Sequence, residues 1–137
     1  MEIPDVSVKL TNRDMDVLAV LWDSDRPLTA SEVVEVNPAL NKNTVQPVLR
    51  KLLKNKLIKV ADIVYSGTVL SRSYVSAMSR DEFALHHLSS DFKKIEKNLS
   101  KASFLSFLLK AEDDPKRLDE DIKELEELLD SYKNKEE

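Results

Sequence analysis

The stretch NKNTVQPVLRKLLKNKLIK, residues 41–59, has the pattern of an amphipathic helix. It contains six basic residues and no acidic one, although the chain of 137 residues has a formal net charge of -4. Gln46, Arg50 and Lys54 lie four residues apart and therefore share one face of a helix. The opposite face is apolar and consists of Val45, Val48, Leu49, Leu52 and Leu53. A helix with one buried face and one cationic, hydrogen-bonding face is suited to enter a DNA groove.

Pro47 decides where this helix is expected to begin. Asn41 and Asn43 are both suitable N-cap residues. Proline is tolerated in the first turn of a helix, whereas in the interior it costs roughly 3 kcal/mol. The sequence therefore predicts Asn43 as the cap and an end near Asn55.

Two shorter helices are expected before this one. Thr11 is predicted to cap the first, and Pro27 follows its end. The buried side of the first helix is predicted to hold Met15, Leu18, Leu21 and Trp22. Thr29 is predicted to cap the second helix, which extends from Ala30 to about Val36 with Val33 and Val36 pointing inward.

A β-hairpin is expected after the basic helix. Residues 58–64 and 69–75 are rich in β-branched and aromatic side chains, and Gly67 lies between them as the only glycine of the chain. Three helices followed by a hairpin is the order of a winged helix-turn-helix. We therefore predict a mainly α protein with a small β-hairpin, in which residues 1–77 form a winged-helix DNA-binding domain.

The rest of the chain, residues 78–137, is predicted to be a helical dimerisation domain of three helices. The first helix is capped by Ser79, and the last begins near Asp119. Sixty residues in three helices rarely bury this many large apolar side chains within one protomer. The simplest partner that could cover them is a second copy of the same segment. The predicted dimer interface consists of Phe92, Phe104, Phe107, Leu108, Leu118, Ile122, Leu125, Leu129 and Tyr132.

The charge distribution separates the two parts. Residues 1–80 hold 11 Lys and Arg against 9 Asp and Glu, whereas residues 81–137 hold 10 against 16. The first part therefore suits a polyanion better than the second.

The residue types on the basic helix suggest separate roles in DNA binding. Gln46 and Arg50 are types that hydrogen-bond the edges of adenine and guanine. Lysines hold phosphates without reading sequence, and the first helical turn attracts phosphate through the helix dipole. Pro47 could contact a thymine methyl, and Arg72 of the hairpin could reach a neighbouring backbone or the minor groove. The predicted DNA-binding residues are Lys42, Asn43, Thr44, Gln46, Pro47, Arg50, Lys51, Lys54 and Arg72.

Composition argues against other classes of function. The chain has no cysteine, which excludes disulfides and thiolate sites, and its single glycine excludes a phosphate-binding glycine loop. The adjacent His86 and His87 diverge on a helix and cannot chelate one metal together. We expect no enzyme activity, no metal, no cofactor, no secretory signal and no membrane span, and therefore a cytoplasmic protein. The alternative is a winged-helix module that binds an acidic partner protein without direct DNA readout.

Several motifs resemble the BlaI/MecI/CopY penicillinase-repressor family. The similar segments are LTNRDMDVLAVLWDSDRPLTASEVVEV (residues 10–36), NTVQPVLRKLLKNKLI (residues 43–58), the hairpin as far as Ser73-Tyr74, and the tail segments SFLSFLLK and LDEDIKELEELLD. The resemblance covers nearly the whole chain. It implies a homodimeric transcriptional repressor that binds a palindromic operator, with two recognition helices about one DNA turn apart.

The resemblance also bears on induction. Copper-responsive members carry a C-terminal cysteine cluster, and this chain, without cysteine, excludes that route. Members that respond to β-lactams are cut in the dimerisation segment by a sensor-protease system, typically at an Asn-Phe bond. The matching pair here is Ser106-Phe107, and Asn55-Lys56-Leu57 stands where the family usually has a Lys-Gly pair. A sensor or protease partner and a ligand both remain open as the inducing signal.

Overall fold

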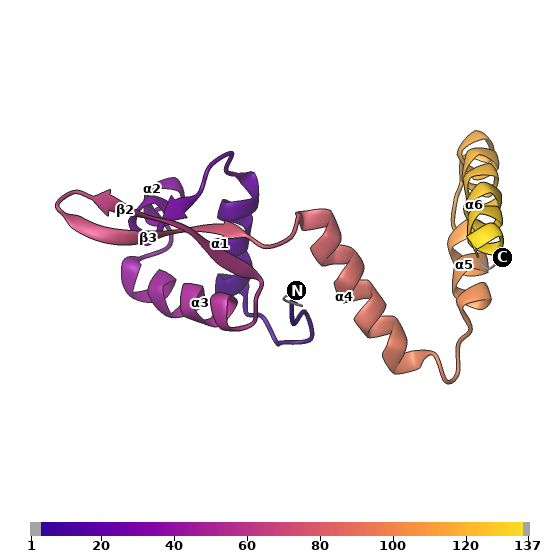
Figure 1. Ribbon diagram of the computed structural model, residues 1–137. Coiled ribbons are helices and arrows are strands. Elements are labelled where there is room, and N and C mark those ends of the chain that lie inside the picture. Colours follow the sequence, from indigo (N-terminus) through magenta and orange to yellow (C-terminus); the bar gives the residue numbers. More distant parts are fainter. Residues whose placement is uncertain (1–3, 136–137) are drawn as a thin grey trace. The chain divides into compact units, whose positions relative to one another are not determined.

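The computed structural model describes residues 4–135 (Figure 1). The chain divides into two compact units between Phe92 and Lys93. The elements, in chain order, are α1 (Asn12–Asp23), β1 (Leu28–Thr29), α2 (Ala30–Val36), α3 (Lys42–Lys54), β2 (Ile58–Ser66), β3 (Val69–Ser76), α4 (Arg80–Ile95), α5 (Lys101–Lys110) and α6 (Pro115–Lys135). This is the predicted winged-helix order followed by three helices. Among the described helices, none is long and apolar enough to cross a membrane.

Thr11 and Thr29 cap the first two helices, as predicted, and each cap is reciprocal. The hydroxyl of Thr11 accepts a hydrogen bond from the Asp14 amide, and the Asp14 carboxylate accepts one from the Thr11 amide. Thr29 and Glu32 repeat this capping box at α2. The prediction for Val36 is wrong, because its side chain is 60% exposed. The helix ends there, and the following turn supplies Leu40 as the next buried side chain.

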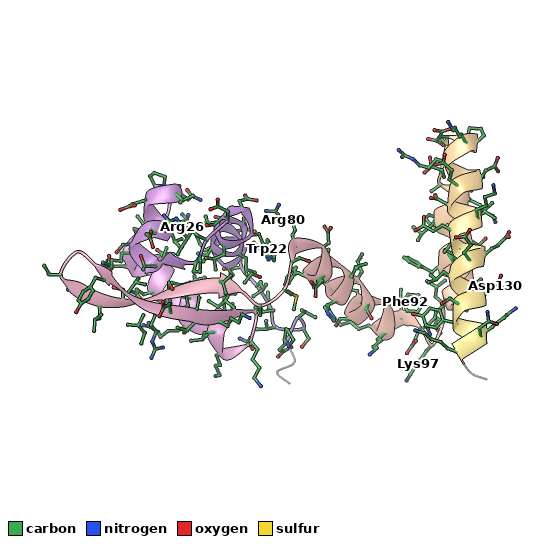
Figure 2. All side chains as sticks on the ribbon, turned by 45° about the horizontal axis from the view of Figure 1, so that its top comes forward. Trp22, Arg26, Arg80, Phe92, Lys97 and Asp130 are labelled. Atoms are coloured by element: carbon green, nitrogen blue, oxygen red, sulfur yellow. The ribbon has the colours of Figure 1, made fainter. Side chains whose placement is uncertain are left out.

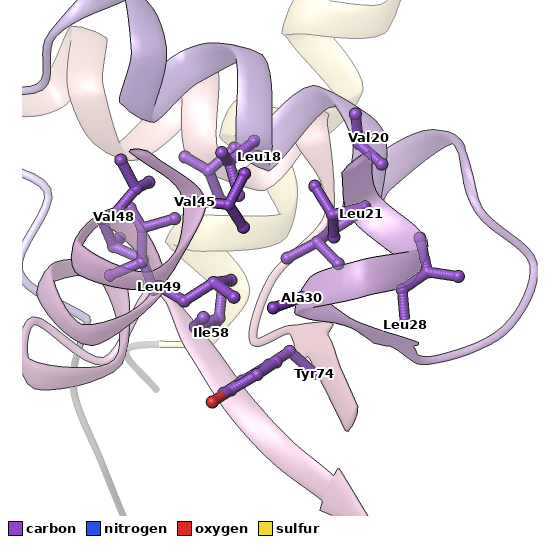
Figure 3. Close-up of a cluster of buried hydrophobic side chains, with 14 of the residues drawn as sticks. Leu18, Val20, Leu21, Leu28, Ala30, Val45, Val48, Leu49, Ile58 and Tyr74 are labelled. Atoms are coloured by element: carbon purple, nitrogen blue, oxygen red, sulfur yellow. The ribbon is translucent and has the colours of Figure 1, made fainter. Parts of the chain in front are cut away.

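One apolar core holds the three short helices against the sheet (Figure 3). Leu18 and Leu21 of α1 are buried as predicted, while Met15 and Trp22 are partly buried against the same core. The apolar face of α3 is also buried, except for the half-buried Leu53. The core thereby turns the other face of α3 toward solvent. The fully buried side chains include Leu18, Leu28, Leu40, Leu49, Leu52, Leu57 and Ile58.

The basic helix begins earlier than predicted. Asn41, not Asn43, is the N-cap, and its side-chain oxygen accepts a hydrogen bond of 2.9 Å from the Thr44 amide. Pro47 therefore lies inside α3, where it removes the amide that would have bonded the Asn43 carbonyl. Both Asn43 and Pro47 are exposed, so water can bind the freed carbonyl. This exposure explains why the interior position is tolerated.

A Schellman motif ends α3 without a glycine. The Lys56 amide bonds the Leu53 carbonyl, and the Leu57 amide bonds the Leu52 carbonyl. Lys56 adopts a φ of 63°, the left-handed region that favours glycine. Leu57 and Ile58 are then buried at once, which fixes where β2 starts.

The sheet has three antiparallel strands in the order β1-β3-β2. The predicted hairpin is present, with strands slightly longer than predicted and Gly67 at φ 67° in the turn. The sequence did not predict β1, which pairs Leu28 with Tyr74 and Thr29 with Ser73. This strand of two residues ties the start of α2 to the wing.

The first turns of α4 belong to the same compact unit as the winged helix. Ser79 caps this helix by accepting a hydrogen bond from the Glu82 amide. Phe83 is buried, and its ring centroid lies 5.3 Å from that of Trp22. Arg80 lies over the Trp22 ring at 5.4 Å and pairs with Asp23 (Figure 2). These contacts explain why the compact unit extends past residue 77, the end of the DNA-binding domain predicted from sequence.

The second unit begins in the last turn of α4 and consists mainly of two helices, α5 and α6. Ser100 caps α5 through the Ser103 amide. The last helix begins at Pro115 rather than near Asp119, with the Asp114 side chain accepting from the Lys116 amide. Proline suits the first position of a helix because its missing amide has no intrahelical partner there.

Candidate nucleic-acid interface

The outer face of α3 and one face of the wing enclose a groove of about 440 Å³. We call it the α3–wing groove. Its walls are formed by Lys42, Gln46 and Arg50 of α3, Val69, Leu70, Ser71, Arg72 and Tyr74 of β3, and Ala30 and Ser31 of α2. Three of these residues are cations and none is an Asp or Glu. The groove is therefore a local positive surface on a chain whose net charge is -4.

The structure brings together four of the residues predicted to bind DNA. Lys42, Arg50 and Arg72 are exposed, and Gln46 is half-buried in the groove wall. Gln46 and Arg50 lie about one helical turn apart on the same face of α3, so the two side chains can contact neighbouring positions along a ligand. The groove combines hydrogen-bonding groups on α3 with a guanidinium on the wing.

Asn43, Pro47 and Lys54 are exposed on α3 but lie outside the α3–wing groove. Lys54 is in the last turn of the helix. Its position suits a contact to the side of the groove rather than within it. Their roles in DNA binding stay predictions.

Lys51 departs from the expected phosphate contact. Its ammonium lies 2.5 Å from the carboxylate of the buried Asp14 and 2.9 Å from the Lys9 carbonyl oxygen. Burial alone would raise the pKa of Asp14, but hydrogen bonds from Lys51 and the Thr11 amide outweigh it and lower the pKa below 3.8. Lys51 therefore joins α3 to α1 instead of facing outward with Arg50.

The first turn of α3 is also less open than predicted. The Thr44 amide is engaged by the Asn41 side chain, and the Thr44 hydroxyl lies 3.2 Å from the same oxygen. The amide is therefore already bonded within the protein, and the predicted DNA contact of Thr44 stays a prediction. The Thr44 amide donates its hydrogen bond to the side chain of Asn41, the N-cap of α3.

The opposite face of the wing has a different charge. A second hollow of about 570 Å³ lies between the start of α2 and the wing, and its walls include Arg26, Glu32, Glu35 and Asp62. Here carboxylates outnumber cations, so this side does not favour a polyanion. The two faces of the same hairpin are thus electrostatically distinct.

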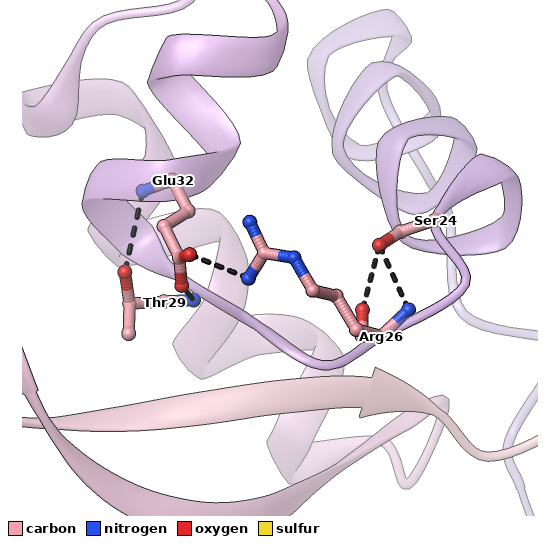
Figure 4. Close-up of polar contacts among 4 residues, drawn as sticks. All are labelled: Ser24, Arg26, Thr29 and Glu32. Carbon is pink, nitrogen blue, oxygen red and sulfur yellow. Dashed lines mark hydrogen bonds and ion pairs between the residues drawn. The ribbon is translucent and has the colours of Figure 1, made fainter.

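A polar network fixes the start of α2 beside the groove (Figure 4). Arg26 donates to the Glu32 carboxylate at 2.6 Å, and Ser24 bonds both the amide and the carbonyl of Arg26. The hydrogen bond from the Thr29 amide and the pair with Arg26 hold the pKa of Glu32 below its usual range. These contacts hold α2, which supplies one wall of the groove.

Sequence reasoning missed the β3 wall of the groove apart from Arg72. Leu70 and Tyr74 lie two residues on either side of Arg72, and alternation along a strand places all three on one face. That period was readable in the sequence. Which face of β3 lies toward α3 depends on how the strands pair in the sheet, and the local sequence of β3 does not specify that pairing.

The residues predicted to form a dimer interface are apolar and largely accessible. In α5, Phe107 is 70% exposed, and Phe104 and Leu108 are also exposed. In α6, Leu129 and Tyr132 are more than half exposed, while Leu118 and Leu125 are half-buried between the helices.

One apolar groove of about 410 Å³ runs between α5 and α6. Its lining includes Leu105, Leu109, Leu118 and Ile122. Phe92, which belongs to the first compact unit, is half-buried. The second unit therefore exposes an apolar surface that a partner could cover.

Among residues 4–135, His86 and His87 included, no group of three or more His, Asp or Glu side chains is placed to hold a metal ion. His87 stacks on Phe83 with ring centroids 6.0 Å apart, and its Nε2 lies 3.8 Å from the Asp91 carboxylate. The stacking gives His87 a packing role at the start of α4.

Comparison of the sequence with protein families gives the same class of fold as the structure. The family model described as penicillinase repressor matches residues 10–131. That range includes every residue that lines the α3–wing groove, all of α5, and α6 as far as residue 131. No curated protein matches the chain significantly. Because the match spans most of its length, the chain belongs to the penicillinase repressor (BlaI/MecI/CopY) family, whose members are generally DNA-binding, winged-helix transcriptional repressors.

Proposed function

We propose that this repressor binds a palindromic operator as a homodimer and acts by occupying the promoter. Each protomer places α3 in a major groove, where Gln46 and Arg50 hydrogen-bond base edges. Lys42, Lys54 and Arg72 hold phosphates on either side. The observation that carries this proposal is the α3–wing groove, which gathers three cations and no carboxylate on an acidic chain.

The proposed dimer forms through α5 and α6. The apolar residues of these helices are too exposed to be explained by packing within one protomer. A second copy would cover them and would supply the second recognition helix that a palindrome requires. The proposed division of labour follows, with DNA binding in residues 1–77 and dimerisation in residues 78–137.

Dimerisation also offers a route to induction. Phe107 of the Ser106-Phe107 pair is exposed, but the pair lies within α5. A sensor or protease partner that opened and cut this helix would release the repressor, because a monomer binds only one half-site.

The experiment is selection of duplexes from a random pool by the full chain, followed by titration of the enriched duplex at several salt concentrations. We expect an enriched palindrome. Three phosphate contacts per protomer predict that log K falls with log salt at a slope of about -5 for the dimer. A chain that enriches no duplex, or that binds with a slope near zero, would instead support the protein-interaction alternative.

A further inference from the structure

The segment that precedes α1 packs on the core and reaches the last turn of α3. Residues 4–10, which we call the N-terminal segment, carry the apolar side chains of Val6, Val8 and Leu10, which are partly buried against the core. The residues between them are exposed. The part of the segment before Leu10 lies outside the range matched by the family model, so membership of the family assigns it no role.

Two backbone groups of the N-terminal segment bond the end of α3. The Asp5 amide donates a hydrogen bond of 2.9 Å to the carbonyl of Asn55, the C-cap of α3. The Lys9 carbonyl accepts one of 2.9 Å from the ammonium of Lys51, which also bonds the carboxylate of Asp14. The last carbonyls of a helix have no partner within the helix. The segment therefore supplies bonds that α3 itself does not.

A turn fixes the path of the N-terminal segment to α3. The Asp5 carboxylate accepts hydrogen bonds from the Ser7 amide at 3.0 Å and from the Ser7 hydroxyl at 2.6 Å. This local turn and the apolar contacts of Val6 and Val8 hold the Asp5 amide at the Asn55 carbonyl. Figure 1 shows the chain before α1 beside the C-terminal end of α3.

The contacts of Lys51 bear on the direction of the residues that face the groove. Lys51 follows Arg50 directly, and successive side chains of a helix are about 100° apart around its axis. Bonds from Lys51 to Asp14 and Lys9 therefore restrict rotation of α3 about its own axis, and with it the directions of Gln46 and Arg50.

A small rotation of α3 would affect base contacts more than phosphate contacts. Helical side chains reach about 5–6 Å from the axis, so a rotation of about 20° would move their ends by about 2 Å. Contacts that read a ligand need positions accurate to about 0.5 Å. The attraction between a cation and a phosphate changes only gradually with distance. Loss of the restraint should therefore reduce sequence preference while leaving general affinity for DNA.

We propose that the N-terminal segment sets the rotation of α3 and thereby the base specificity of the repressor. Its residues and Lys51 are positioning residues, because they act through Gln46 and Arg50 rather than by touching a base. This inference rests on the proposed function, in which those two side chains hydrogen-bond base edges.

The test measures the affinity of the full chain for the duplex enriched by selection and for a random-sequence duplex of equal length. Val6→Ser/Val8→Ser removes the apolar contacts that hold the segment on the core. Affinity for the enriched duplex should fall roughly tenfold, which is about the discrimination from one good base contact. Affinity for the random duplex should change by less than about twofold, because no cation is removed. Val6→Ile/Val8→Ile keeps the apolar contacts and should retain the parent's ratio of the two affinities.

A second pair of variants leaves the core side chains unchanged. Asp5→Pro removes both the amide that bonds Asn55 and the carboxylate that bonds Ser7. Asp5→Asn removes the same charge but keeps the amide and a side-chain oxygen that can accept from Ser7. The lost charge should raise affinity for both duplexes alike in both variants. Only Asp5→Pro should lower the ratio of enriched to random affinity, by about threefold.

The outcomes distinguish this inference from the proposed function. If the parent enriches no duplex, the proposed function fails. If the parent enriches a duplex, and Val6→Ser/Val8→Ser and Asp5→Pro both keep its ratio of affinities, this inference alone is overturned. Unfolding followed by Trp22 fluorescence gives the folded fraction of each variant. Equal losses on both duplexes that follow the folded fraction would show that the segment only stabilises the fold, and would also overturn the inference.

Discussion

The ammonium of Lys51 lies 2.5 Å from the carboxylate of Asp14, which joins the last turns of α3 to the first turn of α1. Asp14 is 3% exposed and also accepts the Thr11 amide in the cap of α1. One buried carboxylate thus starts α1 and orients α3. The pair holds Lys51 against α1 and away from the face that carries Gln46 and Arg50, so it helps to orient α3 on the core.

Replacing Asp14 with Asn should destabilise the protein by about 1–3 kcal/mol near pH 7, because it removes the buried negative charge that accepts hydrogen bonds from Lys51 and from the Thr11 amide. The folded-state pKa of Asp14 is depressed, so its stabilising contribution is present above the unfolded value and is lost as pH falls through the folded value. The difference between parent and variant should therefore shrink below about pH 4. Urea unfolding followed by Trp22 fluorescence measures both effects.

The control for this prediction is Asp16→Asn, at an exposed acid two residues away on the same helix. It removes the same charge without touching Lys51, so its unfolding free energy should stay within about 0.5 kcal/mol of the parent. Equal losses from both substitutions would show that net charge, not the Asp14–Lys51 pair, is responsible.

Lys56→Gly should stabilise the protein by about 0.5–1 kcal/mol. Lys56 has a φ of 63°, where a side chain costs roughly 1–2 kcal/mol that glycine avoids, partly offset by the entropy of glycine in the unfolded chain. Lys54→Gly is the counterpart inside α3 and should destabilise by about 1 kcal/mol. Thermal unfolding of the two variants should shift in opposite directions. A lower melting temperature for Lys56→Gly would contradict the argument.

The elements with a strong local signal were predictable from sequence. Thr11 and Thr29 both cap their helices as predicted, and each precedes by three positions the acidic residue that completes a capping box. The hairpin was fixed by a single glycine between two β-branched runs. In these cases, the interactions that specify the element lie within a few residues of each other.

The errors had two causes. The penalty for Pro47 argued for a later helix start, but Asn41 caps the helix and the exposed Pro47 is tolerated inside it. The other errors concern contacts between residues that are distant in sequence. Lys51 looked like any exposed lysine, and only the fold brings Asp14 to it, 37 residues away in sequence. The β3 wall of the groove also depends on pairing between distant strands.

The two cations Arg50 and Lys54 should differ in what they contribute to DNA binding. Arg50 lines the α3–wing groove, so Arg50→Ala should weaken binding to the selected duplex by about 1–3 kcal/mol and relax preference at one base pair. Lys54 lies outside the groove, so Lys54→Ala should weaken binding to all duplexes alike and reduce the salt slope. Competition titrations against a panel of single-base variants compare the two. Uniform loss from Arg50→Ala would remove its role in base readout.

Charged substitutions in the second unit should separate the proposed dimer. Phe107 is 70% exposed on α5 and Leu125 is half-buried on α6, so Phe107→Asp and Leu125→Asp place a charge on the surface that the second copy would cover. Sedimentation should show monomers, and operator affinity should fall because each protomer then binds one half-site. Lys123→Glu, on the exposed side of α6, changes charge by more and should leave the dimer intact. Both Asp variants should keep the unfolding transition of Trp22, because that residue belongs to the other compact unit. A stable dimer in both Asp variants would place the interface elsewhere on the chain.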